Sequence, residues 1–326
     1  MTLIEAFEKW AVEGVPGHPD KVVETLLSKL FFFGDKVYKV YKKEENSISK
    51  LDRAGRIEFY RQDFYWNNRM SPEIYIKLQP LKENNGLFLN TSFEEADDFY
   101  ILMNKIDDSQ NLTTLLGKGG MQDEQIRKVV REMGNRLKAI SRENGEEIED
   151  ILQTGWREFN NRNIEALEWI YEASPALPFE TSRRVISFLQ DIVDKEEYFS
   201  FKRCPRPSAA IDNQSDNILL LNDNVCFIDI YPPKKIWRAR DDLFVLARLA
   251  TDVAVLGNKE MSEMVYDEYR NIAPAWPSQV TDIYEIESAL IKTAYYFIIK
   301  KAGLAERYLS FIESHPLYLR KKHETQ

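Results

Sequence analysis

Residues 210–230 read AIDNQSDNILLLNDNVCFIDI and set four aspartates and four asparagines around two short apolar runs. Residues 217–221 and 225–230 have the apolar, β-branched character of strands. The three residues between them, 222–224, suit a tight turn because Asn and Asp tolerate left-handed backbone conformations. The stretch predicts a β-hairpin preceded by an acidic loop.

The acids of this hairpin suit a metal and phosphate site. A hairpin symmetric about Asp223 places Asn217 opposite Asp229, and opposed residues share one face with Cβ atoms about 4.5–5.5 Å apart. Mg²⁺ prefers oxygen ligands from one or two carboxylates, water and substrate phosphates. Asp212 lies in the loop ahead of Asn217, where it can accept a proton from a hydroxyl or orient it, as phosphoryl transfer requires. A solvated turn with nothing bound explains the same residue types, since any turn uses Asp and Asn.

Length and charge narrow the class of protein. The chain has 326 residues, which suggests two packed lobes. Its net charge of -9 argues against binding nucleic acid or an anionic membrane, because such proteins need a cationic surface. The same charge is compatible with a cationic small-molecule ligand.

Cysteine and histidine usage excludes several kinds of site. Cys204 and Cys226 have no CxxC spacing and no histidine pair beside them, so neither a zinc site nor a disulfide framework is indicated. The three histidines indicate no nucleophilic triad. The N-terminus lacks the pattern of a signal peptide, and acids and a lysine interrupt the apolar segment 283–299. We expect a soluble, cytoplasmic protein.

The first hundred residues predict a small sheet with one helix. Strand-like runs occur at residues 22–25, 29–33, 37–41, 73–78 and 99–103. Residues 51–70 have helical spacing, with Ile57, Tyr60, Phe64 and Asn67 on one stripe. We therefore expect a five-stranded antiparallel lobe carrying one helix over residues 1–103.

Residues 104–326 predict a larger, mainly helical lobe that contains the hairpin. Apolar spacing indicates helices at 123–140, 181–193, 241–256 and 284–301, the last ended by Gly303. The predicted fold class is α+β, with two lobes.

The order of these elements resembles a protein-kinase-like fold: a strand meander with a lysine on its third strand, a helix with an inward acid, then the hairpin. In particular, the chain is similar to the aminoglycoside phosphotransferase and choline kinase group. In a bacterial, aminoglycoside phosphotransferase-like branch a segment resembling VETxxSxxFxxGDxxYKxxKP opens the first lobe. Residues 22–43, VVETLLSKLFFFGDKVYKVYKK, match this segment, and the similarity runs from residue 18 to residue 270.

The resemblance implies roles for the acids of the hairpin region. The group's HGDxxxxN motif falls on residues 210–217, which makes Asp212 the catalytic base and Asn217 a magnesium ligand. Asp229 corresponds to the main metal carboxylate. Ala210 and Ile211 replace the histidine and glycine of the motif, and these replacements remove features that hold the catalytic loop.

The resemblance also implies a nucleotide-binding set in the first lobe. Lys39 matches the lysine that grips the α- and β-phosphates, with Lys42 and Lys43 as alternatives. Its acidic partner is Asp63 or Glu58. No glycine-rich loop joins the first two strands, so Thr25 and Ser28 supply the hydroxyls there. Further implied residues are Met103 and Lys105 beside the nucleotide and Asp242 as a brace of the catalytic loop.

Two functions follow from the resemblance. The first is an ATP-dependent, magnesium-dependent kinase that phosphorylates a hydroxyl of a small molecule, which the acidic chain allows to be cationic. The second is a pseudokinase, a nucleotide-binding or protein-interaction module with a degraded catalytic motif. The acceptor, the choice of ATP or GTP and the oligomeric state stay open.

Overall fold

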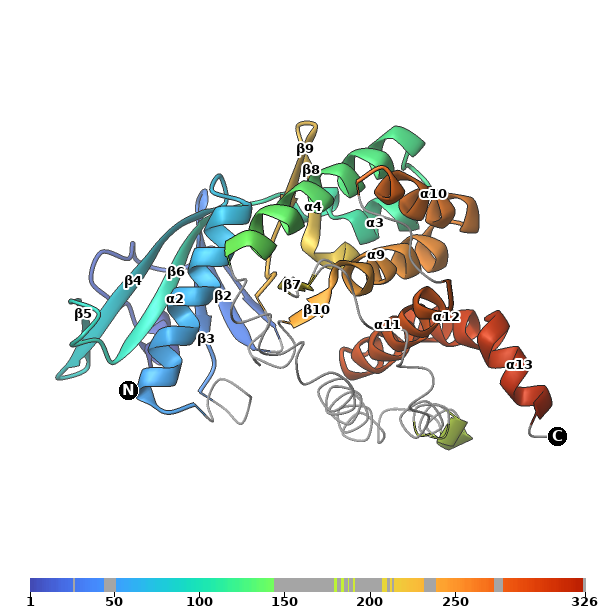
Figure 1. Cartoon of the computed structure of the whole chain (residues 1–326). Helices are drawn as coiled ribbons and strands as arrows, with labels where there is room; N and C mark the ends of the chain where they lie inside the picture. The colour runs from blue at the N-terminus through green and yellow to red at the C-terminus, as the bar shows by residue number, and fades with distance from the viewer. Residues whose placement is uncertain are drawn as a thin grey trace. The chain divides into compact units, whose positions relative to one another are not determined.

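A computed structural model describes residues 1–25, 27–43, 51–143, 179–180, 183–184, 187, 190, 207–209, 212, 214–231, 239–272 and 278–324 (Figure 1). The chain divides into two compact units, Met1–Gln110 with Leu219–Lys234, and Asn111–Ile218 with Lys235–Gln326. Residues 219–234 thus group with the first unit. The assignment of nucleotide binding to residues 1–103 and of catalysis to residues 104–326 stays a prediction.

The first unit contains a six-stranded antiparallel sheet in the order β1-β2-β3-β6-β4-β5. Its strands are β1 (Lys21–Glu24), β2 (Ser28–Phe33), β3 (Lys36–Tyr41), β4 (Tyr75–Asn84), β5 (Leu87–Asn90) and β6 (Asp98–Asn104). The prediction of five strands was wrong, because β4 continues to Asn84 and pairs with β5. The turn between them is Asn85-Gly86, whose positive φ angles of 49° and 85° are those of a tight hairpin turn.

One helix covers each face of this sheet. Helix α2 (Arg53–Met70) begins after Asp52, whose side chain accepts a hydrogen bond from the Gly55 amide at 2.7 Å. Its inner side chains join a core with Val37 and Tyr41, whereas α1 (Leu3–Glu8) joins a separate core with Tyr38 and Val40. Successive residues of a strand point to opposite faces. Lys39 therefore faces α2.

The predicted helix 51–70 is confirmed, although its buried stripe is rotated. Tyr60 and Asn67 are buried as expected, but Ile57 and Phe64 are only partly buried. The inner face is completed by Phe59, Asp63, Trp66 and Met70.

Helices make up most of the described part of the second unit. They are α3 (Leu112–Gly117), α4 (Asp123–Glu143), α9 (Asp242–Leu256), α10 (Lys259–Arg270), α11 (Ser278–Ile298), α12 (Ala302–Ser314) and α13 (Pro316–Glu324). A short strand β7 (Pro207–Ala209) pairs with β10 (Ala239–Asp241). The helices expected at 123–140 and 241–256 are confirmed, and the helix expected at 181–193 lies outside the described residues. Gly303 lies inside α12, so it does not end the preceding helix as predicted.

The stretch 210–230 contains a separate two-stranded sheet, β8 (Ile218–Leu221) and β9 (Asn224–Phe227). Asn222 and Asp223 form the turn with φ angles of 48° and 63°. The turn has two residues rather than the three expected. Asn217 ends a 3₁₀ helix, Ser215–Asn217, and Asp229 follows β9, so neither lies in a paired strand. The predicted register with Asn217 opposite Asp229 was therefore wrong.

The predicted α+β class is confirmed. Among the helices of the described residues, none combines the length and the apolar character needed to cross a membrane.

Candidate functional site

Lys39 is the centre of a buried charge cluster in the first unit. Its side chain is only 5% exposed, and its Nζ lies 2.5 Å from Asp229 Oδ1 and 3.8 Å from Asp63 Oδ2. Burial alone would lower the pKa of Lys39, but the carboxylates of Asp229 and Asp63 outweigh it, and the pKa is raised. The lysine is therefore held in its charged form, as a phosphate-binding residue requires.

Asp63 is the helical acid nearest to this lysine. It accepts hydrogen bonds from the Tyr41 hydroxyl at 2.7 Å and the Asn67 amide at 2.8 Å. Burial raises the pKa of Asp63, although Lys39 and these two donors oppose the shift. The alternative acid, Glu58, is exposed and accepts a hydrogen bond from Gln62 instead. The question between Asp63 and Glu58 is thus decided by burial, in favour of Asp63.

The segment that carries Asp229 is fixed by three side chains. The amide of Phe227 donates to Ser71 Oγ at 2.8 Å, that of Asp229 to Tyr75 Oη at 3.0 Å, and that of Ile230 to Asn67 Oδ1 at 3.2 Å. Asp229 has a positive φ of 50°, which is uncommon for a residue with a side chain. These bonds hold its carboxylate against Lys39 while 51% of the side chain stays exposed.

The other predicted lysines and hydroxyls have structural partners. Lys42 pairs with Glu24 on β1 at 2.6 Å, and Lys43 pairs with Asp98 on β6 at 2.9 Å. Thr25 Oγ1 and Ser28 Oγ lie 2.9 Å apart, and Thr25 Oγ1 also accepts from the Ser28 amide at 2.9 Å. The two hydroxyls therefore form a hydrogen bond with each other across the connection between β1 and β2. Their predicted role in nucleotide binding stays a prediction.

Met103 and Lys105 lie at the end of β6. Met103 is buried in the core that faces α2, paired with Val37 on β3. The amide of Lys105 donates to the Asp35 carbonyl at 2.8 Å, and its side chain is exposed. Contact of either residue with a nucleotide stays a prediction.

Asp212 belongs to a polar group in the second unit. Asn217 Nδ2 donates to the Asp212 carbonyl at 2.8 Å, which links the predicted base to the predicted metal ligand. Arg248 Nη1 on α9 lies 2.7 Å from Asp212 Oδ1, while Arg248 Nη2 donates to Gln214 at 3.1 Å. The contact between Arg248 Nη1 and Asp212 Oδ1 is an ion pair without hydrogen-bond geometry. Within the described chain, Asp212 Oδ1 accepts no hydrogen bond. Sequence reasoning missed Arg248.

A second acid, Asp252, braces this loop. Its Oδ2 accepts the Ser215 amide at 2.8 Å, and its Oδ1 accepts the Tyr308 hydroxyl at 2.6 Å. Asp252 is 1% exposed. From the sequence we predicted that Asp242 braces the loop; the side chain of Asp242 lies outside the described part of the structure. An acid within the apolar run of α9 was the available signal for Asp252, because buried acids are almost always paired.

Lys292 on α11 completes the group. Its Nζ lies 2.5 Å from Asp216 Oδ2 and 3.6 Å from Asp252 Oδ2, and the Tyr296 hydroxyl donates to Asp216 at 3.0 Å. Burial alone would raise the pKa of Asp216, but Lys292 and the hydrogen bonds from Thr113 and Tyr296 lower it. The loop from Asp212 to Asn217 is therefore held by charged contacts from two helices.

The chemistry of the donors fits a hard divalent cation. Asp229 has a half-exposed carboxylate, and Asn217 has a side-chain amide whose nitrogen donates to the Asp212 carbonyl; carboxylate and amide oxygens are ligands of hard divalent cations. Asp229 belongs to the first unit and Asn217 to the second. Their joint ligation of Mg²⁺ stays a prediction.

Another cluster lies in the second unit, where ligand atoms of Asp282, Glu285 and His315 come within 4.8 Å of one another. His315 Nδ1 accepts the Leu317 amide at 3.2 Å, which leaves Nε2 to donate to Glu285 Oε2 at 3.2 Å. The Tyr266 hydroxyl donates to the other oxygen of Glu285. With His315 as a donor, we interpret the cluster as a hydrogen-bonded network.

Comparison with known proteins places the fold. No protein family matches the sequence, and no curated protein is similar to it. Among solved structures, a glucosamine kinase in complex with glucosamine, ADP and inorganic phosphate matches with a TM-score of 0.53 and 10% identity, over 93% of this chain and 81% of that one. Choline kinase from Cryptosporidium parvum Iowa II matches with a TM-score of 0.53 and 13% identity, over 99% of this chain and 95% of that one. The GDP complex of aminoglycoside 2'-phosphotransferase-IIIa matches with a TM-score of 0.54 and 11% identity, over 94% of this chain and 97% of that one.

At these identities the likeness shows the fold alone. The chain has the protein-kinase-like fold of small-molecule kinases, and the resemblance to the aminoglycoside phosphotransferase and choline kinase group is confirmed at that level.

Proposed function

We propose that this protein is a nucleotide-dependent phosphotransferase that transfers the γ-phosphate of ATP or GTP to a hydroxyl of a small molecule. The observation that carries the proposal is the buried, charged Lys39 between Asp63 and Asp229. A buried lysine between two acids stabilises a core no better than hydrophobic side chains would. Lys292 has the same kind of pairing, but the nearest acid of Lys39, Asp229, has a half-exposed carboxylate. The arrangement around Lys39 suits a residue that binds phosphate.

The residues have distinct roles in this proposal. Lys39 holds the α- and β-phosphates, and Asp63 keeps the lysine charged and oriented. Asp229 and Asn217 hold Mg²⁺, which would neutralise charge on the phosphates. Asp212 orients the acceptor hydroxyl and accepts its proton.

The acceptor we propose is a hydroxylated, cationic small molecule. The neighbours of comparable fold are kinases of glucosamine, choline and an aminoglycoside, all of which carry a positively charged nitrogen at neutral pH. The net charge of -9 favours such an acceptor electrostatically.

A second candidate is a pseudokinase that binds nucleotide without transfer. Ala210 and Ile211 stand where the group has histidine and glycine, and Arg248 lies against the carboxylate of Asp212. This ion pair engages one oxygen of the carboxylate that would take the proton of the acceptor hydroxyl. These two observations support the alternative.

The deciding experiment compares nucleotide consumption and nucleotide binding in the same proteins. Consumption of ATP and of GTP is measured with Mg²⁺ or Mn²⁺ and a panel of amino sugars, aminoglycosides and amino alcohols. Asp212→Ala removes the proposed base, and Asp267→Ala on the exposed surface of α10 is the matched control. We expect Asp212→Ala to lower turnover by about 10²–10⁴-fold while nucleotide binding and the control stay unchanged.

Binding is followed by thermal stability. A nucleotide at one hundred times its dissociation constant stabilises the folded state by about 2.7 kcal/mol, and Lys39→Ala should abolish that gain. Binding without turnover for any acceptor would favour the pseudokinase. The absence of both binding and turnover would contradict the two candidates together.

A further inference from the structure

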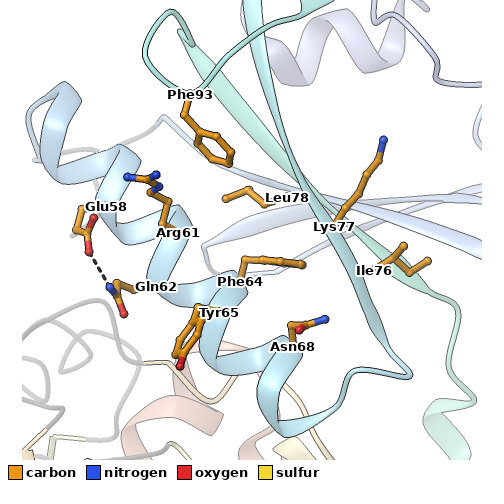
Figure 2. Close-up of a pocket in the computed structure, with 10 residues that line it drawn as sticks. All are labelled: Glu58, Arg61, Gln62, Phe64, Tyr65, Asn68, Ile76, Lys77, Leu78 and Phe93. Atoms are coloured by element: carbon orange, nitrogen blue, oxygen red, sulfur yellow. Dashed lines mark hydrogen bonds between the residues drawn. The ribbon is translucent and has the colours of Figure 1, made fainter. Parts of the chain in front are cut away.

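A groove on the first unit lies between α2 and β4, on the side of α2 away from Lys39. Figure 2 shows Phe64, Leu78 and Phe93 between the helix and the strand, and the volume of the groove is about 570 Å³. The floor is apolar and consists of Phe64, Leu78 and Phe93, which are partly buried and pack on the core below. Phe93 also stacks on Phe99 with ring centroids 5.8 Å apart, so the floor is anchored to the sheet.

The groove has two large, exposed apolar side chains in its lining. Tyr65 is 48% exposed and Ile76 is 40% exposed, and both line it. Ile76 is the extra residue of a β-bulge, since the register of β4 against β6 shifts between Tyr75 and Lys77. A bulge re-aims side chains relative to a regular strand. Two large side chains exposed beside an apolar floor indicate a surface that another molecule can cover.

The groove is also cationic, in contrast to the chain as a whole. Arg61 and Lys77 line it, and neither forms an ion pair with a carboxylate anywhere in the described ranges. Arg61 instead lies over the Phe93 ring at 5.0 Å, and Lys77 donates to Gln79 at 3.0 Å. The acid in the lining, Glu58, accepts a hydrogen bond from Gln62 at 2.7 Å (Figure 2). Two cations against one acid in the lining give the groove a net positive charge on a protein of net charge -9, which favours an anionic partner.

We propose that this groove docks an acidic peptide segment of a partner protein, with an aromatic or aliphatic side chain seated on Phe64, Leu78 and Phe93. The charge of Arg61 and Lys77 selects acidic residues beside that anchor, and the apolar floor supplies most of the affinity. The inference is independent of the proposed phosphotransferase activity, because no residue of the lining belongs to the Lys39 or Asp212 groups.

The position of the groove on α2 adds a structural consequence. Asn68 in the lining donates to the Tyr75 carbonyl at 2.6 Å, and the Tyr75 hydroxyl accepts the Asp229 amide. The neighbouring residues Asp63 and Asn67 hold Lys39 and the segment after β9. A docked segment would contact the helix that positions the partner of Lys39.

The test uses the full-length protein and synthetic peptides. A fluorescent nine-residue peptide of glutamates around one central phenylalanine is titrated with the protein, and binding is followed by anisotropy. Two matched peptides replace the glutamates by glutamines or the phenylalanine by serine. The protein variants are Arg61→Glu with Lys77→Glu, and the control Lys82→Glu reverses an exposed charge on the same strand outside the groove.

We expect micromolar binding of the acidic phenylalanine peptide that weakens with added salt, because the charges involved are exposed. Each of the two matched peptides and the double variant should bind at least about tenfold more weakly, equivalent to about 1.4 kcal/mol, while Lys82→Glu binds normally. Equal binding of the glutamine peptide, unchanged binding by the double variant, or no binding at about 1 mM would overturn the proposal. Displacement of the peptide as the protein concentration rises would also overturn it, in favour of a second copy of this chain as the occupant.

Discussion

At the scale of single residues, the clearest feature is a lysine that stays charged inside an apolar core. Moving an ammonium group out of water costs several kcal/mol even after relaxation, so Lys39 depends on its partners. Asp229 supplies the closer contact, and Asp63 supplies a second carboxylate that is itself held by Tyr41 and Asn67. Because aspartate is one methylene shorter than glutamate, the longer 3.8 Å contact with Asp63 is understandable.

Removing Asp63 should therefore destabilise the protein. In Asp63→Ala the buried Tyr41 hydroxyl loses its acceptor and Lys39 loses one of two carboxylates. We expect the free energy of unfolding in urea to fall by about 3 kcal/mol. Glu58→Ala, five residues earlier on the exposed face, should change it by less than about 0.5 kcal/mol. Equal stability of Asp63→Ala and wild type would show that the cluster does not need this acid.

At the scale of secondary-structure elements, the loop of residues 212–217 is held from α9 and α11. Asp252 accepts the Ser215 amide and the Tyr308 hydroxyl and lies 3.6 Å from Lys292. Asp252 lies 37 residues after Ser215 along the chain, so packing of α9 against the loop supplies this contact.

A graded series tests this brace. Asp252→Ala leaves a buried amide and a buried hydroxyl without an acceptor, and we expect a loss of about 3–5 kcal/mol. Tyr308→Phe removes one hydrogen bond and should cost about 1 kcal/mol. Both values are read from urea unfolding curves. A loss in Asp252→Ala no larger than that in Tyr308→Phe would contradict the role of Asp252.

The hairpin of β4 and β5 offers a test of turn geometry. Gly86 has a φ of 85° with nothing within 4 Å of an added Cβ, so Gly86→Ala changes only the backbone preference. A left-handed conformation costs an L-residue about 1–2 kcal/mol, and we expect stability to fall by that amount. Gly120, equally open but without a positive φ, is the control, and Gly120→Ala should be neutral or slightly stabilising. The two changes are compared by thermal unfolding.

At the scale of the whole molecule, partly buried carboxylates give opposing contributions to the dependence of stability on pH. Burial raises the pKa of Asp282, with Glu285 adding to the shift and His315 and Arg320 opposing it. The folded state therefore favours the protonated acid, and stability is lost as pH rises from the ordinary aspartate value of 3.8 through the raised one. For Asp216 the pKa is lowered, so stability is lost as pH falls.

Two amide variants separate these contributions. Asp282→Asn should be more stable than wild type at neutral pH, and its advantage should vanish as pH falls below the ordinary aspartate value. Asp216→Asn should be less stable than wild type at neutral pH, and its deficit should shrink on acidification. Melting temperatures between pH 3 and pH 7 measure both. The same pH trend in both variants would show that the assigned shifts are wrong.

Local pattern located most of the main sheet and several helices, but it did not locate α1, α3, α10, α12 or α13. Period-two runs located all but one of the strands of the main sheet, and period-3.6 spacing located α2, α4 and α9. Strand β5 was missed because Pro80 and the following polar residues hide the continuation of β4 toward the Asn85-Gly86 turn. The missed feature was itself a local signal, since Asn-Gly is a common hairpin turn.

The sequence by itself determined the candidates for the site, whose chemical roles stay a prediction: Lys39 on the third strand, Asp63 or Glu58 on a helix, and the acids from Asp212 to Asp229. Only the tertiary structure decided that Asp63 rather than Glu58 approaches Lys39, and that Asp229 forms the closer ion pair. It also decided that Asp252 and Arg248 hold the loop around Asp212. The physical reason is that periodicity reports which face of an element is buried, whereas ion pairs and hydrogen bonds depend on packing between elements far apart in the chain.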